Sequence, residues 1–176
     1  MKILAFAGSN STTSINHTLL EIVKTDNPDL DIDILDIRNL QAPIYSIDIE
    51  QTNGAPKVLK ELVSKISEYD ALILALPEHN GLPSAFFKNI IDWCSRINNK
   101  FLGEKQTLLL STSPGSKGGA NNLEKLEPLF KYWGAEIVGK YSVPFFNDAV
   151  NTETSKISED HKLALRELLS DLKVLN

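Results

Sequence analysis

Short apolar runs that alternate with longer segments of helical period constrain the fold of this chain most strongly. Residues 71–76 read Ala-Leu-Ile-Leu-Ala-Leu and residues 107–110 read Thr-Leu-Leu-Leu, so neither run alternates between apolar and polar positions. Strands of this kind are covered on both faces, as in a parallel sheet between two layers of helices. The pattern predicts five strands, at residues 2–7, 31–36, 71–76, 107–111 and 136–143.

Between and after these strands lie segments whose apolar residues recur every three or four positions, as on one face of a helix. Ser14 is suited to cap the first helix, and Pro56 lies near the start of the second. Pro128 is expected either to fall in the first turn of the fourth helix or to kink it. The predicted helices cover residues 15–23, 58–66, 86–97, 126–133 and 165–172.

Five strands each followed by a helix, within 176 residues, predict an α/β fold. The expected architecture is a flavodoxin-like, doubly wound parallel sheet of strand order 2-1-3-4-5, with helices on both faces and one domain over residues 1–176. Ligands bind such sheets outside the carboxyl ends of the strands, near the switch between the first and third strands. The predicted site therefore comprises residues 8–14, 77–83 and 112–119, which follow the first, third and fourth strands.

The first of these loops is almost entirely small and hydroxylated. Gly8 permits a sharp turn, and the helix that begins near Ser14 offers free N–H groups and the positive end of its dipole. Together with the hydroxyls, these groups can bind a phosphate without a lysine. A plain polar turn with a helix cap is the alternative, and the position after the first strand favours phosphate. The hydroxyls belong to Ser9, Ser11, Thr12, Thr13 and Ser14.

The second and third loops leave several roles open. Gly81 permits a positive φ in the second loop, and His79 is either a general acid–base or a residue that packs against a ligand. Glu78 is a candidate base, helix cap or interface ion pair. Lys117, in the glycine-rich third loop, either is solvated or holds the phosphate of a passing substrate. Cys94 falls on an apolar helical stripe and is interpreted as a core residue.

Composition excludes several classes of protein. The net charge is −5 and the chain has no basic run, which argues against binding to nucleic acid or to anionic membranes. A single cysteine excludes an intramolecular disulfide, and the three histidines show no metal-ligand spacing. No apolar run approaches the roughly 20 residues of a membrane span, and no signal peptide is evident. We therefore expect a soluble, cytoplasmic protein without a bound metal.

Three motifs at the predicted loops resemble those of the NAD(P)H-dependent FMN reductase family, which includes quinone, chromate and azo reductases. Residues 8–16 are similar to the pattern G-S-x-R-x-x-S-x-N, with Ser11 where arginine is frequent. The second motif resembles P-E-Y-N-G-S-x-P-x-x-L-K-N-x-I-D-W, with His79 for the tyrosine and Leu82 for the serine. Residues 113–119 are similar to S-P-G-x-x-G-G.

This resemblance, which covers residues 2 to about 150, implies one noncovalently bound FMN, with NAD(P)H as co-substrate. It implies no catalytic side chain, and a homodimer or homotetramer with the flavin near the subunit interface. The residues implied to hold the phosphate are Ser9, Ser11, Ser14, Ile15 and Asn16. Those implied to line the flavin ring are Pro77, Glu78, His79 and Asn80 on one side, and Ser113, Pro114, Gly115, Lys117 and Gly118 on the other.

The expected function is transfer of a hydride from NAD(P)H, through bound FMN, to a quinone, flavin, azo or similar small-molecule acceptor. A non-enzymatic electron carrier of the flavodoxin type is the main alternative. The second and third loops contain no aromatic residue, which counts against a carrier. An FMN-binding regulatory module is a further alternative, which the departures at Ser11 and Leu82 leave open.

Overall fold

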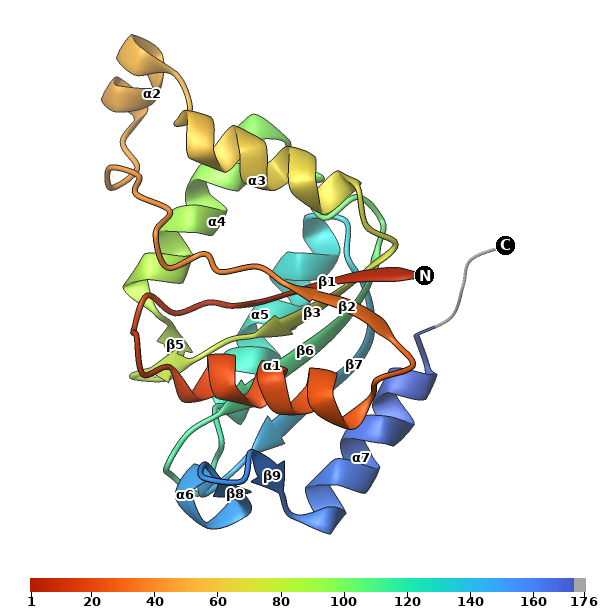
Figure 1. The fold of residues 1–176 in the computed structure, drawn as a ribbon. Helices are drawn as coiled ribbons and strands as arrows, with labels where there is room; N and C mark the ends of the chain where they lie inside the picture. Colours follow the sequence, from red (N-terminus) through yellow and green to blue (C-terminus); the bar gives the residue numbers. More distant parts are fainter. Residues whose placement is uncertain (173–176) are drawn as a thin grey trace.

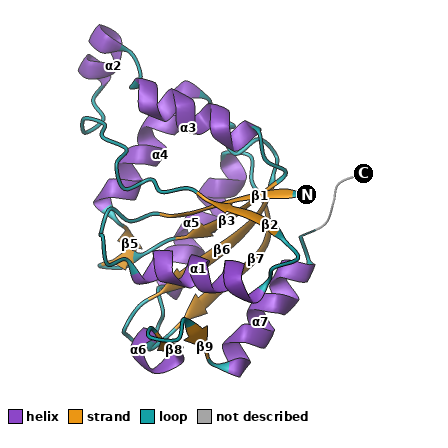
Figure 2. Ribbon diagram, viewed as in Figure 1, coloured by secondary structure: helices purple, strands orange, loops and turns teal. Residues whose placement is uncertain are grey.

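The computed structural model describes residues 1–172 and has a central sheet between two layers of helices (Figure 1; Figure 2). The five strands are parallel and lie in the order β2-β1-β3-β6-β7, which confirms the predicted order of 2-1-3-4-5. They are β1 (Lys2–Ala7), β2 (Asp31–Ile34), β3 (Ala71–Ala75), β6 (Gln106–Thr112) and β7 (Glu136–Val143).

Each face of the sheet is covered by its own layer of helices. One face packs against α1 (Ile15–Asp26) and α7 (Glu159–Ser170). The other packs against α3 (Lys57–Ser67), α4 (Ala85–Ile97) and α5 (Ala120–Tyr132). The five predicted helices are therefore present, on both faces as expected.

Alternate residues of each central strand enter different cores, which explains why these strands are apolar throughout. In β3, Leu72 and Leu74 join the core beneath α3, α4 and α5, whereas Ile73 joins the core beneath α1 and α7. In β6, Leu109 and Leu108 are divided in the same way. Because side chains alternate across a strand, a strand buried on both faces needs apolar residues at consecutive positions.

The structure excludes one of the two alternatives for Pro128, a place in the first turn of its helix. This residue lies well inside α5, rather than in its first turn, because the helix begins at Ala120 instead of near Leu126. A proline there has no N–H to offer to the Glu124 carbonyl, so one bond of the helical ladder is missing.

Several short elements were not predicted. They are α2 (Ile47–Asn53), the hairpin of β4 (Glu78–His79) with β5 (Leu82–Pro83), α6 (Phe146–Ala149), and the hairpin of β8 (Val150–Asn151) with β9 (Lys156–Ile157). Helix α2 projects from the body of the molecule and buries none of its residues, so it has no apolar stripe that periodicity could reveal (Figure 1). The other elements are too short for a periodic pattern.

Within residues 1–172, no helix combines the length and the apolar character that crossing a membrane requires.

Candidate functional site

The loops after β1, β3 and β6 meet at the carboxyl edge of the sheet and enclose a cavity of about 210 Å³. Most of the residues predicted to hold the cofactor line it. The exceptions are Asn80, Gly115, Lys117 and Gly118. Thr13 and Thr112 also line it. Both belong to the predicted loops 8–14 and 112–119, although neither was among the residues implied to hold the cofactor.

Hydroxyl groups of the first loop accept hydrogen bonds from the backbone of the loop and of the first turn of α1. The Ser9 Oγ accepts the N–H of Ser11, and the Ser11 Oγ accepts that of Thr13, each at 3.2 Å. The Ser14 Oγ accepts the His17 N–H at 3.2 Å, so Ser14 caps α1 as predicted. Since each oxygen acts here as an acceptor, the hydroxyl hydrogens of Ser9 and Ser14 are free to point toward a ligand.

The N-terminus of α1 adds further donors to this cavity. The N–H groups of Ile15 and Asn16, in the first turn, have no acceptor within residues 1–172. Within residues 1–172, no lysine or arginine lines the cavity. An anion here would be held by neutral donors and by the helix dipole, which is equivalent to about half a positive charge.

The Asn16 side chain braces the cavity rather than facing a ligand. It is 2% exposed, its Nδ2 donates to the Thr112 carbonyl at 3.1 Å, and its Oδ1 accepts the Thr112 N–H at 3.0 Å. These two bonds join the first turn of α1 to the end of β6. The predicted phosphate contact of Asn16 therefore remains a prediction for its backbone N–H alone.

The second loop is a β-hairpin with a two-residue turn. Asn80 and Gly81 form the turn with φ values of 55° and 75°, and His79 pairs with Leu82 across it. An Asn-Gly pair with both φ values positive is typical of the tightest hairpins. The positive φ of Gly81 confirms the prediction. Asn80 lies at the tip of the hairpin and outside the cavity wall, and its predicted contact with the flavin ring stays a prediction.

One side of this hairpin is fastened to α5. The Glu78 carboxylate accepts the Asn122 N–H at 3.0 Å and the Asn121 Nδ2 at 3.2 Å. The Lys125 Nζ donates to the Gly81 carbonyl at 2.6 Å. Residue 119, the N-cap of α5, is a glycine without a side-chain cap, so Glu78 serves as the cap from another loop. Of the three roles left open for Glu78, the structure shows this one.

Glycines shape the third loop. A Cβ on Gly118, whose φ is 57°, would lie 2.6 Å from the carbonyl carbon of Val143. A Cβ on Gly119, whose φ is 86°, would lie 1.9 Å from the Ser111 Oγ. The loop therefore crosses the end of β7 and packs on β6 only because both positions lack a side chain.

The segment after β7 supports the third loop from the other side. The Phe145 N–H donates to the Gly115 carbonyl, and the Phe146 N–H to the Ser113 carbonyl, both at 3.1 Å. The Gly115 carbonyl therefore helps to hold the third loop in place, and Gly115 does not line the cavity. Lys117 is exposed.

Two residues of the sequence analysis, and one carboxylate beyond β2, have defined surroundings. The exposed His79 side chain has no hydrogen-bond or ion-pair partner in the described part of the chain, so nothing orients it as a general acid or base. Burial raises the pKa of the Cys94 thiol to about 12, which fits a core residue and not a reactive one. Beyond β2, hydrogen bonds from Arg38 lower the pKa of the Asp36 carboxyl to about 2.

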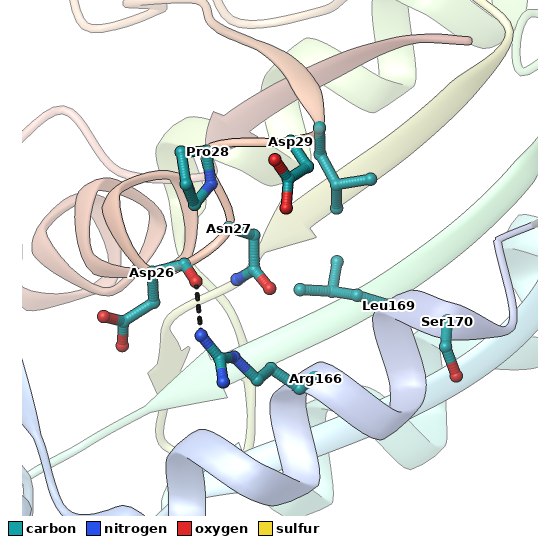
Figure 3. Close-up of a pocket in the computed structure, with 8 residues that line it drawn as sticks. Asp26, Asn27, Pro28, Asp29, Arg166, Leu169 and Ser170 are labelled. Atoms are coloured by element: carbon teal, nitrogen blue, oxygen red, sulfur yellow. Dashed lines mark hydrogen bonds between the residues drawn. The ribbon is translucent and has the colours of Figure 1, made fainter.

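A larger cavity, of about 470 Å³, lies between the C-terminal end of α1 and α7 (Figure 3). Two of its charged groups already have partners: the Arg166 Nη2 donates to the Asp26 backbone carbonyl at 3.1 Å, and the Asp26 Oδ1 lies 3.0 Å from the Lys162 Nζ. The helix end that faces it is the negative one. This cavity offers neither a hydroxyl cluster nor a helix N-terminus to a ligand, so the smaller cavity is the candidate site.

Comparisons with known proteins find a matching family model and several relatives. The model of the NADPH-dependent FMN reductase family matches residues 1–149. An uncharacterized protein of Mycoplasma pneumoniae is 32% identical, over 80% of this chain and 85% of its own length. The NADPH:quinone oxidoreductase of Arabidopsis thaliana is 34% identical over 68% of this chain, and the match spans only 61% of the plant protein.

Among solved structures, the chain is similar in fold to FerB of Paracoccus denitrificans, described as a flavoenzyme NAD(P)H:acceptor oxidoreductase. The TM-score is 0.75, with 22% identity, over 97% of this chain and 94% of that one.

Proposed function

The chain belongs to the NADPH-dependent FMN reductase family, and on this premise we propose that it carries reducing equivalents from NAD(P)H, through noncovalently bound FMN, to a small-molecule acceptor. Quinones, free flavins and azo compounds are the acceptor classes that we propose. Names of relatives support this: a plant relative is an NADPH:quinone oxidoreductase, and a bacterial relative is an NAD(P)H-dependent FMN reductase.

The observation that carries the proposal is the set of neutral donors around the N-terminus of α1. A terminal phosphate monoester needs several donors converging on one point. The hydroxyls of Ser9 and Ser14 and the free N–H groups of Ile15 and Asn16 supply them from one wall of the cavity. These residues fit the phosphate of FMN, and we propose that they hold it together with Ser11.

The size of the cavity limits how much of FMN it encloses. At about 210 Å³ it is smaller than the roughly 300–1,000 Å³ of pockets that enclose a drug-sized ligand. We therefore propose that the cavity takes the phosphate end, while the ring lies across the second and third loops. The backbone of residues 77–79 and of residues 113–115 would then face the ring.

When bound, FMN supplies the hydride chemistry, so the chain needs no general acid of its own. Overall, NAD(P)H, a proton and a quinone yield NAD(P)⁺ and a hydroquinone, with the proton taken from solvent. The chain's own contribution is to bind and orient. Glu78 and Asn122 hold the second loop, since the Asn122 Nδ2 donates to the carbonyls of Leu76 and Pro77 at 3.3 and 3.1 Å.

An absorption spectrum of the purified chain, recorded without oxygen before and after NADH or NADPH, tests the proposal. We expect a yellow protein that bleaches when nicotinamide nucleotide is added. A yellow protein that does not bleach would indicate a carrier or a regulatory module instead. A colourless protein that takes up no added FMN would contradict the proposal.

The proposal extends to assembly and location. We propose a homodimer or homotetramer in the cytoplasm. Size-exclusion chromatography coupled to light scattering measures the assembly, and a mass equal to one chain would contradict it.

A further inference from the structure

The hairpin of β4 and β5 presents two different faces. Its back is fastened to α5 by the Glu78 carboxylate and by the Lys125 Nζ, which donates to the Gly81 carbonyl. Three hydrogen bonds thus connect a six-residue segment to one helix. Since its turn is also of the tightest kind, this segment is held rigidly before any ligand arrives.

The front of the hairpin faces the candidate site. His79 lines the cavity, and it is paired directly with Leu82 across the hairpin. Directly paired residues of an antiparallel ladder project from the same face, with Cβ atoms about 4.5–5.5 Å apart. The Leu82 side chain therefore lies on the same face as His79, beside the cavity.

Leu82 is nevertheless unprotected, because 54% of it is exposed to solvent. It contributes neither to the two hydrophobic cores nor to the cavity wall. A leucine that is rigidly presented at the rim of a binding site, with no partner in the described part of the chain, has apolar surface available to a second molecule.

We propose that Leu82 selects the electron acceptor, favouring planar, apolar acceptors such as quinones over hydrophilic ones. This inference rests on the proposed function, because it takes the ring of FMN to lie across the second loop. An acceptor that stacks on that ring would place its apolar edge against the leucine and remove it from water. A hydrophilic acceptor such as ferricyanide gains nothing from the same contact.

Steady-state kinetics of the FMN-loaded full chain with saturating NADPH tests this assignment. The variants are Leu82→Ser, the conservative Leu82→Met, and the control Leu163→Ser, which changes a leucine of α7 that is 61% exposed. For 2-methyl-1,4-naphthoquinone we expect Leu82→Ser to raise KM about five-fold, which is about 1 kcal/mol at 1.4 kcal/mol per factor of ten. Ferricyanide reduction should be unchanged, and both other variants should match the parent chain.

A fluorescence titration of FMN into the parent chain and each variant precedes the kinetics. It distinguishes a failure of the proposed function from a failure of the inference about Leu82. A parent chain that binds no FMN would refute the proposed function and this inference with it. Normal FMN binding with an unchanged naphthoquinone KM in Leu82→Ser would refute the inference alone. An equal rise in KM for Leu163→Ser would also refute the inference. A Leu82→Ser variant that changes only the elution volume in size-exclusion chromatography would refute it too, because Leu82 would then be a subunit contact.

Discussion

The two edges of the sheet each carry a cavity, and the smaller one has the chemistry of a binding site. The carboxyl-edge cavity, of about 210 Å³, is lined by hydroxyls and faces the N-terminus of α1. The amino-edge cavity, of about 470 Å³, lies at the opposite end of the same helix, where Asp26 and Arg166 already have hydrogen-bond or ion-pair partners (Figure 3). Available donors and the direction of the helix dipole, rather than volume, therefore distinguish a site from a surface hollow.

The edges also differ in how they are built. Five of the buried polar side chains lie at the carboxyl edge and hydrogen-bond to the backbone of neighbouring strands and loops: Asn16, Ser84, Ser111, Thr112 and Asn122. Such bonds hold irregular loops in one conformation, because a buried polar group left without a partner costs about 1–3 kcal/mol. The carboxyl edge is thus the more sensitive of the two to small changes, which the following predictions test.

Replacing Gly119 with alanine should have the largest effect. The new Cβ would overlap the Ser111 Oγ, and the φ of 86° would be strained for alanine. We expect a loss of about 3 kcal/mol or more in the free energy of unfolding, measured by urea denaturation.

The matched change at the amino edge is Gly103→Ala. Its φ is 62°, but the nearest atom to a new Cβ is 3.6 Å away. We expect a loss of only about 1 kcal/mol, from backbone strain alone. Equal losses in the two variants would contradict the difference between the edges.

Replacing Asn16 with alanine removes both bonds that the side chain makes to Thr112 and leaves two buried backbone groups unpaired. We expect a loss of about 2–4 kcal/mol in urea denaturation. Its amino-edge counterpart, Arg166→Ala, removes one exposed bond to the Asp26 carbonyl and should cost no more than about 0.5 kcal/mol. A loss below about 0.5 kcal/mol for Asn16→Ala would contradict this, and would show that water replaces the two hydrogen bonds to Thr112.

Replacing Ser14 with alanine removes a helix cap and a donor to the proposed phosphate. We expect about 1 kcal/mol less stability and about ten-fold weaker FMN binding, measured by fluorescence titration. Ser9→Ala should weaken FMN binding without removing a helix cap, because Ser9 bonds only to the Ser11 N–H. Ser170→Ala, in the wall of the amino-edge cavity, is the control and should leave FMN binding unchanged.

The salt dependence of FMN binding should be weak. Since no lysine or arginine of the described residues lines the cavity, few ion pairs are available for salt to screen. Raising the salt concentration from about 0.05 M to about 0.5 M should change Kd less than about three-fold. A change of ten-fold or more would indicate that a cation such as Lys117 approaches the phosphate.

The smallest effect concerns the pH dependence of stability. Arg38 lowers the pKa of Asp36 from 3.8 to about 2. The folded state therefore gains stability above the ordinary pKa, and this gain is lost as the pH falls from about 4 to about 2. Because the Asp36 side chain is 41% exposed, we expect less than about 1 kcal/mol. The Asp36→Asn variant should not show this loss of stability between about pH 4 and about pH 2. Identical acid-denaturation curves for the variant and the parent chain would contradict the prediction.

Much of this structure could be predicted from the sequence because it depends on burial. The apolar runs such as 71–76 identified strands covered on both faces, and the helical stripes identified the layers that cover them. The strand order then indicated that three loops distant in sequence meet at one edge. The polar composition of residues 8–14 provided an independent sign of the same place.

The sequence could not show which partner a polar side chain takes when that partner is distant in the chain. The Asn16 side chain braces Thr112, and the Glu78 carboxylate caps α5 from another loop. The Asn80–Gly81 turn is a known hairpin signal, but its two-residue strands are too short to show alternation.

By itself, the sequence determined the layers, the strand order and the edge at which the site lies, because local periodicity and composition encode which surfaces avoid water. Only the tertiary structure decided which polar groups at that edge are free. A hydrogen bond between residues far apart in the chain leaves no periodic trace. The Asn16 side chain, for example, is bonded to Thr112, 96 residues away in the chain, so only its backbone N–H is available to a ligand.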